Sequence, residues 1–315
     1  MSGSVAGSVA GSVAGQLADV VARALAEDAP WGDLTSESLL DPTTTTTAVL
    51  RARQEGVLAG IGALPEALAQ AARLVGAEAP AVELLAADGD RLVPGQVLGR
   101  AEGSALAVLR AERTALNLVQ HLSGVATATA EHVALVAAAG ATARVADTRK
   151  TTPGLRALER HAVRCGGGSN HRWSLSDAVL VKDNHLALVG GDVTAALAAV
   201  RARVPHTTFV EVEVDRLDQL PAVLAAGVDG VLLDNFTLDD LRAGVAAVRA
   251  HVAEHGGRVL VEASGGVRRE TIAAIAATGV DVVSVGGLTQ AAHALDVGLD
   301  VGADAEVAPT RTRTG

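Results

Sequence analysis

Residues 230–263 read GVLLDNFTLDDLRAGVAAVRAHVAEHGGRVLVEA, and this stretch decides the fold. Its two ends, GVLLD and RVLVEA, are short and nearly continuous apolar runs, which is typical of strands buried on both faces of a sheet. Between them, residues 238–255 have the length and the mixed polar and apolar character of a helix. A strand, a helix and a second strand in this order indicate a parallel sheet.

The same alternation extends over the second half of the chain. Six strand-like runs are separated by helical segments, and they are ARVAD (143–147), AVLVK (178–182), TFVEVEV (208–214), GVLLD (230–234), RVLVEA (258–263) and DVVSVG (281–286). We therefore predict an α/β fold whose parallel sheet forms either a barrel or a doubly wound layer.

The first half of the chain mixes helices and strands without regular alternation. We expect a helix over 16–27, strands within 46–60, a helix over 64–74 and a strand pair joined by Pro-Gly within 88–103. A long helix over 104–122 follows, with a break near Ser123 and Gly124 and a second helix to about residue 139. The three-fold GSVA repeat of residues 1–15 has no large side chain for a core, so we predict a mobile tail.

The composition excludes several classes of function. The 315 residues carry a net charge of −10, which disfavours binding to nucleic acids or membrane surfaces. Any bound anion must therefore be held by a local basic cluster. The single cysteine, Cys165, excludes both an internal disulfide and a cysteine-based zinc site. No apolar run reaches the length of a membrane span, and we expect a cytoplasmic protein.

Polar or glycine residues follow the predicted strands directly. In a barrel, the C-terminal strand ends build the active site, so these residues are candidates for it. The glycines of Ser264–Gly266 and Gly286-Gly287 fit a phosphate site, although a tight turn explains Ser264–Gly266 equally well. Glu213 and Asp234 are oxygen ligands suited to Mg²⁺, and ion pairs with nearby arginines are the alternative.

Basic residues gather at the same strand ends. They are Arg149, Lys150, His171, Arg172 and Lys182. The chain has 26 basic residues, yet Lys150 and Lys182 are its only lysines. Lysine is a compact charge on a flexible stem, which suits a site where a cation must reach a phosphate or carboxylate without a planar fork. Arg113, on the long helix, is a further candidate.

An ordered set of motifs gives these residues a context. EDAPWGDLT (27–35) and AERTALNLVQHLSG (111–124) come first, and TRKTTPGLR (148–156) and GGGSNHRWSLSDAVLVKDNH (166–185) follow. VEVEV (210–214), VLLDN (231–235), EASGG (262–266) and VGGLTQ (285–290) complete the order. Together they closely resemble the quinolinate phosphoribosyltransferase family over about residues 16–300.

The resemblance implies a fold and a reaction. It implies an N-terminal α/β sandwich domain (16–117), an incomplete α/β barrel (118–287) and a C-terminal segment (288–315) that returns to the first domain and ends in a mobile tail. The implied assembly is a head-to-tail homodimer. The implied reaction converts quinolinate and phosphoribosyl pyrophosphate, with Mg²⁺, into nicotinate mononucleotide, pyrophosphate and CO₂.

The resemblance also implies roles for individual residues. Arg149, His171, Arg172 and Lys182 would bind the quinolinate carboxylates. Lys150 and Lys182 would face the phosphoribosyl group, and Thr151 would also bind substrate. Glu213 and Asp234 would hold the ribose diphosphate and Mg²⁺. The 5′-phosphate would be bound by Ser264, Gly265, Gly266, Val285, Gly286 and Gly287. Arg113 would reach the active site of a neighbouring subunit.

One position departs from the family pattern. Ser174 stands where the family usually has glycine, and serine would be strained there if the backbone needs a positive φ. We expect Asn184 and His185 to form a buried structural pair, and Trp31 and Trp173 to have packing roles. Cys165 is interpreted as a small core residue.

Three other functions are compatible with parts of this pattern. One is a paralogous protein with another nitrogenous acceptor, such as the type associated with molybdenum transport. The second is a non-catalytic protein that binds a phosphate ligand, and the third is an unrelated phosphate-binding barrel enzyme. The complete set of basic motifs argues against the first, and the sandwich-like N-terminal region argues against the third.

Overall fold

The computed structural model describes the backbone of residues 3–188 and 192–302, and the side chains from residue 13 onward within these ranges. The chain divides into two compact units. The first unit comprises the residues up to 130, residues 151–167 and the residues from 291, and the second comprises 131–150 and 168–290. The sequence predicts a mobile tail at the end of the C-terminal segment 288–315, and residues 303–315 of this segment lie outside the described residues.

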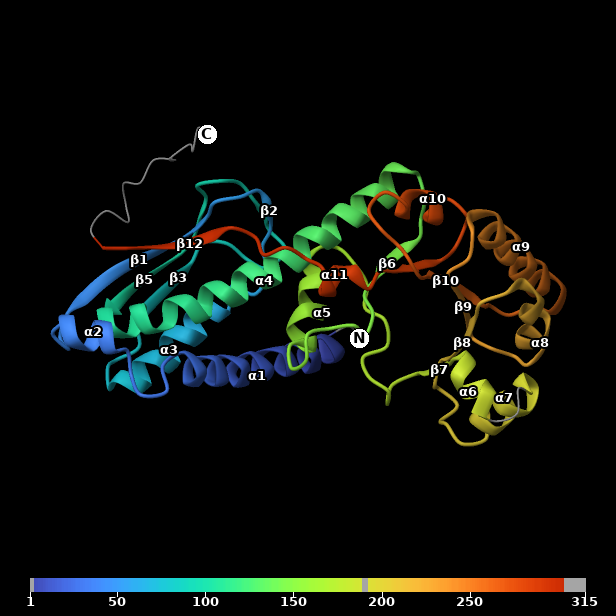
Figure 1. The fold of residues 1–315 in the computed structure, drawn as a ribbon, viewed down its shortest axis with the longest axis horizontal. Helices are drawn as coiled ribbons and strands as arrows, with labels where there is room; N and C mark the ends of the chain where they lie inside the picture. Colours follow the sequence, from blue (N-terminus) through green and yellow to red (C-terminus); the bar gives the residue numbers. More distant parts are fainter. Residues whose placement is uncertain (1–2, 189–191, 303–315) are drawn as a thin grey trace. The chain divides into compact units, whose positions relative to one another are not determined.

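The second unit is built on a parallel six-stranded sheet with the strand order β6-β11-β10-β9-β8-β7 (Figure 1). Its strands are β6 (Arg144–Ala146), β7 (Val179–Val181), β8 (Val210–Val214), β9 (Gly230–Asp234), β10 (Leu260–Ser264) and β11 (Val282–Ser284). All six predicted strands are therefore confirmed. The first strand, β6, lies beside the last, β11, as in a barrel, but β6 and β7 form the two open edges. The sheet is thus the predicted incomplete barrel.

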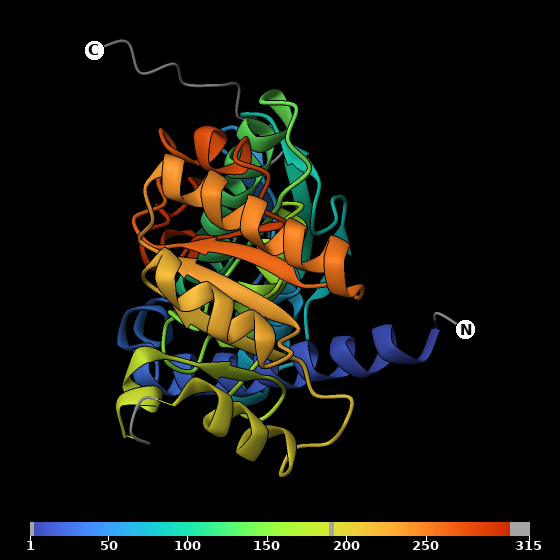
Figure 2. The same ribbon diagram turned by 90° about the vertical axis from the view of Figure 1, so that its right-hand side faces the viewer.

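Helices follow the strands of this sheet in sequence. They are α6 (Asp183–Leu188), α7 (Val193–Arg201), the 3₁₀ turn η1 (Leu217–Gln219), α8 (Leu220–Ala225), α9 (Leu238–His255), α10 (Ile272–Ala276) and α11 (Gly287–Gln290). Figure 2 shows α7, α8 and α9, in yellow to orange, side by side in front of the strands. Because helices cover one face of the sheet, residues such as Val212, Val231 and Val261 are fully buried.

The first unit contains an antiparallel four-stranded sheet with the order β12-β1-β5-β3. Its strands are β1 (Thr45–Ala52), β3 (Ala81–Leu84), β5 (Val97–Ser104) and β12 (Val297–Val301), and a separate two-stranded ladder joins β2 (Gly56–Val57) to β4 (Arg91–Leu92). The pairing of β12 with β1 returns the chain after the barrel to the strands near its start.

Helices complete the first unit. They are α1 (Gly3–Asp28), α2 (Leu34–Leu39), α3 (Ala63–Val75), α4 (Ala105–Ala138, which begins in this unit) and α5 (Arg156–Cys165). The apolar face expected for the first helix is buried at Val20, Val21 and Leu25, and α1 packs against α3 and α5. Helix α2 was not predicted. Asp33 precedes it as the N-cap residue, and its carboxylate accepts hydrogen bonds from the amides of Thr35 and Ser36.

Three local predictions are wrong for identifiable reasons. Helix α1 begins at Gly3 and includes the GSVA repeat, because nothing in that repeat terminates a helix that the following residues already favour. Helix α4 is not broken near Ser123. Strand β4 pairs with β2 and not with β5, because Gly95 and Gln96 exchange hydrogen bonds with Ala52 and direct β5 onto β1.

The continuity of α4 has a tertiary cause. Ser123 Oγ accepts a hydrogen bond from the amide of Ala59 at 3.0 Å. A Cβ on Gly124 would lie 2.0 Å from the carbonyl oxygen of His293, so the glycine serves a close approach of two backbones. Both residues that suggested a break are therefore explained by packing. No helix in the described part of the chain is long and apolar enough to cross a membrane.

Candidate active site

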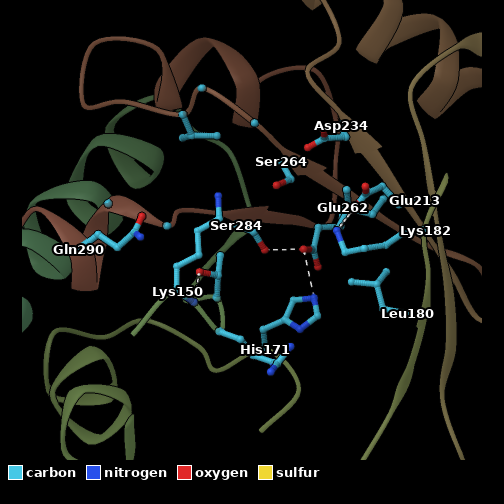
Figure 3. A pocket seen from close by; sticks show the side chains of 18 of the residues that line it. Lys150, His171, Leu180, Lys182, Glu213, Asp234, Glu262, Ser264, Ser284 and Gln290 are labelled. Carbon is cyan, nitrogen blue, oxygen red and sulfur yellow. Dashed lines mark hydrogen bonds and ion pairs between the residues drawn. The ribbon is translucent and has the colours of Figure 1, made fainter. Parts of the chain in front are cut away.

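A cavity of about 540 Å³ opens at the C-terminal ends of the barrel strands (Figure 3). Side chains from all six strands or the residues that follow them reach it, as expected for a barrel. The lining residues are Thr148, Arg149, Lys150, His171, Arg172, Leu180, Lys182, Glu213, Leu232, Asp234, Glu262, Ser264, Gly265, Gly266, Val267, Arg268, Ser284, Gly286, Gly287 and Gln290. Basic, acidic and glycine residues predicted from separate motifs therefore meet in one place.

Two arginines give the cavity an excess of positive charge. The Nε of Arg149 is buried and has no hydrogen-bond partner within the described structure, so it is available to an anion. Burial, followed by the nearby charge of Arg149, lowers the pKa of the Arg172 guanidinium. Two guanidinium groups this close repel each other unless a negative ligand lies between them, which indicates a carboxylate or phosphate site.

Each lysine is fixed by a different contact. The Nζ of Lys182 forms an ion pair with Glu213 Oε2, drawn as a dashed line in Figure 3. Lys150 passes over Gly286, where an added Cβ would lie 3.0 Å from the lysine Cδ. Its carbonyl accepts a hydrogen bond from Thr289 Oγ1 at 2.7 Å. The absence of a side chain at Gly286 thus gives room for the lysine stem.

His171 lies against two buried carboxylates. Its Nε2 is 3.4 Å from Glu211 Oε2 and 3.3 Å from Glu262 Oε1. Burial by itself would lower the pKa of His171, but the two carboxylates outweigh burial and raise it. Burial, with the charge of Glu262, raises the pKa of Glu211. Glu262 also accepts a hydrogen bond from Ser284, so Ser284, Glu262 and His171 form a connected polar network in the wall of the cavity (Figure 3).

The acidic pair and the glycines lie at neighbouring strand ends. Asp234 ends β9 and pairs in register with Ser264 at the end of β10. Asn235 has a φ of 58°, and its amide donates to the carbonyl of Ser264 at 2.9 Å. Gly265 has a φ of +91°, and a Cβ there would lie 2.3 Å from Asn235 Oδ1. Glycine is therefore required at 265 by conformation and by space.

Comparisons with known proteins agree with this geometry. Residues 33–123 match the N-terminal domain and residues 125–300 the C-terminal domain of the quinolinate phosphoribosyl transferase family. The chain belongs to the quinolinate phosphoribosyl transferase family. The sequence is 44% identical over 282 residues to the nicotinate-nucleotide pyrophosphorylase [carboxylating] of Mycobacterium leprae, covering 89% of this chain and 95% of that protein.

Solved structures of similar proteins have the same fold. NadC from Streptococcus pyogenes has a TM-score of 0.82 and 37% identity, covering 91% of this chain and 96% of that one. The nicotinate-nucleotide pyrophosphorylase from Francisella tularensis has a TM-score of 0.79 and 36% identity over the same 91% and 96%. The barrel and the smaller N-terminal unit are thus both features of the quinolinate phosphoribosyl transferase family.

Three residues that the family resemblance placed in the site do not line this cavity. Arg113 lies on α4 in the first unit with 58% of its side chain exposed, 3.9 Å from Glu112. Thr151 also belongs to the first unit, and its hydroxyl accepts a hydrogen bond from Arg156 at 3.1 Å. Val285 is buried, and its amide donates to the carbonyl of Ala146 at 2.9 Å. A role for Val285 in binding would have to come from its backbone.

Sequence reasoning missed several lining residues. Glu262, which was missed, alternates with the predicted Ser264 along β10, as Glu211 does with the predicted Glu213 along β8, so each pair points to one side of the sheet. A polar residue inside a buried run was therefore the available signal for Glu262 and Ser284. The remaining basic residue, Arg268, lies in a loop, and no periodicity marks it.

Other interpretations also need correction. Asn184 and His185 are exposed, because α6 starts directly after β7 and buries none of its residues. Trp31 is 91% exposed and has no packing role in this chain. Ser174 is unstrained, since Asn235 is the only non-glycine residue with positive φ in the described part of the chain. Cys165 is partly exposed and does not lie in the core.

Proposed function

We propose that this chain is a carboxylating nicotinate-nucleotide pyrophosphorylase. It transfers the phosphoribosyl group of phosphoribosyl pyrophosphate to quinolinate and releases pyrophosphate and CO₂, giving nicotinate mononucleotide for NAD biosynthesis. The observation that carries the proposal is the meeting of five basic residues with Glu213 and Asp234 in one cavity of a family member. The basic residues are Arg149, Lys150, His171, Arg172 and Lys182.

The dicarboxylate binds to the arginine side of the cavity. Quinolinate has two adjacent carboxylates, and the guanidinium groups of Arg149 and Arg172, which both line the cavity, can receive them. The Nε of Arg149 supplies a donor that the protein does not use itself. His171, kept protonated by its carboxylate neighbours, adds a further positive charge. These contacts orient the ring nitrogen towards the ribose.

The phosphoribosyl group binds to the lysine and glycine side. Backbone amides of Ser264–Gly266 and Gly286-Gly287 bind its 5′-phosphate, because glycine allows the close approach. Lys150 and Lys182 place point charges near the diphosphate that leaves. A flexible ammonium group suits the place where the ribose joins the diphosphate. During the reaction, negative charge builds up on the departing pyrophosphate and positive charge on the ribose, and the ammonium can follow this change.

Glu213 and Asp234 fit the Mg²⁺ that the family implies. The ammonium of Lys182 forms an ion pair with one carboxylate oxygen of Glu213, Oε2. The side-chain amide of Asn235 donates a hydrogen bond to Asp234 Oδ2 at 2.7 Å. One oxygen of each carboxylate thus remains for a hard cation within the described structure, a donor type that Mg²⁺ prefers. When bound, Mg²⁺ would help to neutralise the charge of the departing pyrophosphate.

The transfer itself requires no general base. The lone pair of the pyridine nitrogen forms the bond to the anomeric carbon, while the bond to pyrophosphate breaks and its electron pair leaves with pyrophosphate. Glu213 or Asp234 stabilises the positive charge that develops on the ribose. The protein's main contribution is therefore to position the two anions and to neutralise their charges.

Decarboxylation follows from the product of the first step. The ribosylated ring nitrogen is cationic, so it stabilises the electron pair left on the neighbouring ring carbon when its carboxylate departs as CO₂. That carbon then takes a proton from solvent water. The basic residues bind the carboxylate that remains and hold the ring in place.

Assembly and location complete the proposal. We expect a cytoplasmic homodimer or larger assembly in which Arg113 serves the site of the neighbouring subunit. The exposure of Arg113 on α4 supports this role, because its guanidinium is available to another molecule. The substrates are quinolinate and phosphoribosyl pyrophosphate, and no nucleic-acid or membrane partner is expected.

A coupled product assay tests the function. Purified protein with quinolinate, phosphoribosyl pyrophosphate and Mg²⁺ should form nicotinate mononucleotide and CO₂ in equal amounts. If neither product forms while phosphoribosyl pyrophosphate still binds, the acceptor is a different one, as in the molybdenum-associated paralogues. Binding of both substrates without turnover would identify a non-catalytic relative.

The Gly265→Ala substitution should weaken phosphoribosyl pyrophosphate binding. The new Cβ would collide with Asn235, at 2.3 Å from Oδ1 and 2.8 Å from the amide nitrogen. Displacement of this loop by a few tenths of an ångström or more should raise the KM for phosphoribosyl pyrophosphate about tenfold to a hundredfold. Steady-state kinetics with each substrate varied in turn measures this.

Gly227→Ala is the matched control. Gly227 has a similar φ of +74°, but an added Cβ meets no atom within 4 Å and the residue does not line the cavity. This variant should be strained to a similar degree and keep its KM. Equal KM values for both variants would show that the loop at Gly265 does not hold the phosphate.

A further inference from the structure

Three potential metal ligands meet in the first unit, outside the cavity described above. Asp88 lies in the loop between β3 and β4, and His161 and Cys165 lie one turn apart on α5. The Nε2 of His161 is 2.7 Å from Asp88 Oδ2 and 3.5 Å from Cys165 Sγ. The three donor atoms all lie within 4.8 Å of one another. The reaction proposed above uses none of these residues.

We propose that Asp88, His161 and Cys165 form a binding site for a zinc-type divalent cation. The carboxylate and the sulfur both approach the same ring nitrogen, Nε2. In a catalytic relay the two partners would contact different nitrogens of the imidazole. Here an oxygen, a nitrogen and a sulfur atom lie close together around one point, which is how ligand atoms are arranged around a metal ion. One cysteine with a nitrogen and an oxygen ligand would thus form a cysteine-containing zinc site, which the cysteine count of the sequence had excluded.

The spacing of the donors agrees with tetrahedral zinc. Zinc–sulfur and zinc–nitrogen bonds of about 2.3 and 2.05 Å at a tetrahedral angle place sulfur and nitrogen about 3.5 Å apart. The observed separation of His161 Nε2 and Cys165 Sγ is 3.5 Å. The oxygen and nitrogen would need to be about 3.3 Å apart in such a site. The hydrogen bond of 2.7 Å between Asp88 and His161 would therefore have to open slightly on binding.

The surrounding backbone holds Asp88 in a ligand orientation. Its Oδ1 accepts a hydrogen bond from the amide of Ile61 at 2.9 Å, which leaves Oδ2 for the ion. Ligating carboxylates are commonly fixed by such outer hydrogen bonds. The loop is fixed as well, because the amide of Gly89 donates to the carbonyl of Leu58 at 2.8 Å. The oxygen ligand is thus positioned before any ion arrives.

The donor set and the exposure decide the class of ion. Sulfur and imidazole donors suit Zn²⁺, whereas Mg²⁺ and Ca²⁺ prefer sites made of oxygen only. The side chains of His161 and Asp88 are 35% and 23% exposed, so an ion can enter and a water can complete four-fold coordination. An ion bound here would tie the loop of Asp88 to α5, and binding to the folded state alone would raise stability.

Binding must displace protons. The hydrogen bond to Asp88, followed by the one to Cys165, raises the pKa of His161 to about 10, so Nε2 carries a proton at neutral pH. Zinc-type cations bind the deprotonated forms of imidazole and thiol, so an ion at this site has to compete with protons for its ligands.

Cobalt is the probe that reports on the sulfur. The full chain, freed of metal with a chelator, is titrated with Co²⁺, and the near-ultraviolet band of a thiolate bound to cobalt is followed. We expect a band that saturates at one equivalent and that Zn²⁺ abolishes. Cys165→Ser should remove the band completely, and Asp88→Asn should weaken binding by more than about tenfold. Both substitutions nearly preserve side-chain size, and thermal unfolding of each metal-free variant checks that it folds.

A histidine pair elsewhere supplies the control. His251 and His255 stack on α9 with ring centroids 4.4 Å apart, and two histidines one turn apart can bind metal without a cysteine. His255→Ala should leave the cobalt–thiolate band and its saturation unchanged. The proposal is overturned if no band forms at millimolar Co²⁺, or if the band survives Cys165→Ser. This readout needs no catalytic turnover, so it stands independently of the proposed function.

Discussion

Replacement of Lys182 by alanine should lower the rate of nicotinate mononucleotide formation about a hundredfold to a thousandfold, the usual loss when one group that stabilises transition-state charge is removed. In the folded protein its Nζ pairs with Glu213, and both residues line the cavity. Without this charge, the Glu213 carboxylate would repel the diphosphate of the substrate. The loss should appear mainly in kcat, because the charge on pyrophosphate grows as it leaves.

Stability separates this effect from misfolding. The Lys182 side chain is 42% exposed, and ion pairs with an exposed partner contribute little to the free energy of unfolding. We therefore expect a melting temperature close to that of the unsubstituted protein.

Lys182→Arg tests whether charge alone is sufficient, and its planar guanidinium group should restore only part of the rate. Arg242→Ala, which breaks an exposed ion pair with Asp239 on α9, should change neither quantity. Normal turnover of Lys182→Ala would remove this residue from the mechanism.

The barrel could be predicted from the sequence because its strands are short apolar runs that are easy to recognise. GVLLD and RVLVEA each contain three consecutive aliphatic residues, 231–233 and 259–261, which is typical of strands covered on both faces. The cavity was predictable for the same reason, since residues that directly follow such strands meet at one end of the sheet. Lys182 and Asp234 were found in this way, and both line the cavity.

The predictions that failed depend on contacts between distant parts of the chain. Local propensity indicated a break at Gly124, but the carbonyl of His293 required a glycine there. The Pro-Gly turn suggested a hairpin, but hydrogen bonds from Ala52 set the pairing of β5. Nothing local indicates that Asp88, more than seventy positions before His161, approaches it. These features are fixed only when the chain folds.

The Gly124→Ala substitution should destabilise the protein by about 3 kcal/mol or more, at the upper end for overpacked positions. A new Cβ would lie 2.0 Å from the carbonyl oxygen and 2.9 Å from the carbonyl carbon of His293. Neither atom belongs to a flexible side chain, so the backbone of residues 293 and 294 would have to move. That segment also donates from Leu295 to the carbonyl of Gln120 at 2.9 Å and leads into β12, so the displacement would strain the pairing of β12 with β1.

A second helical glycine provides a control with the opposite sign. Gly15 lies within α1, and an added Cβ meets no atom within 4 Å. Gly15→Ala should therefore stabilise the protein by up to about 1 kcal/mol, since alanine favours the helix more than glycine does. Chemical denaturation of both variants measures the two free energies of unfolding. If Gly124→Ala is as stable as the unsubstituted chain, the close approach of His293 to α4 is not required by the fold. Opposite signs for two identical substitutions would instead show that a distant carbonyl, and not helix propensity, selects glycine at position 124.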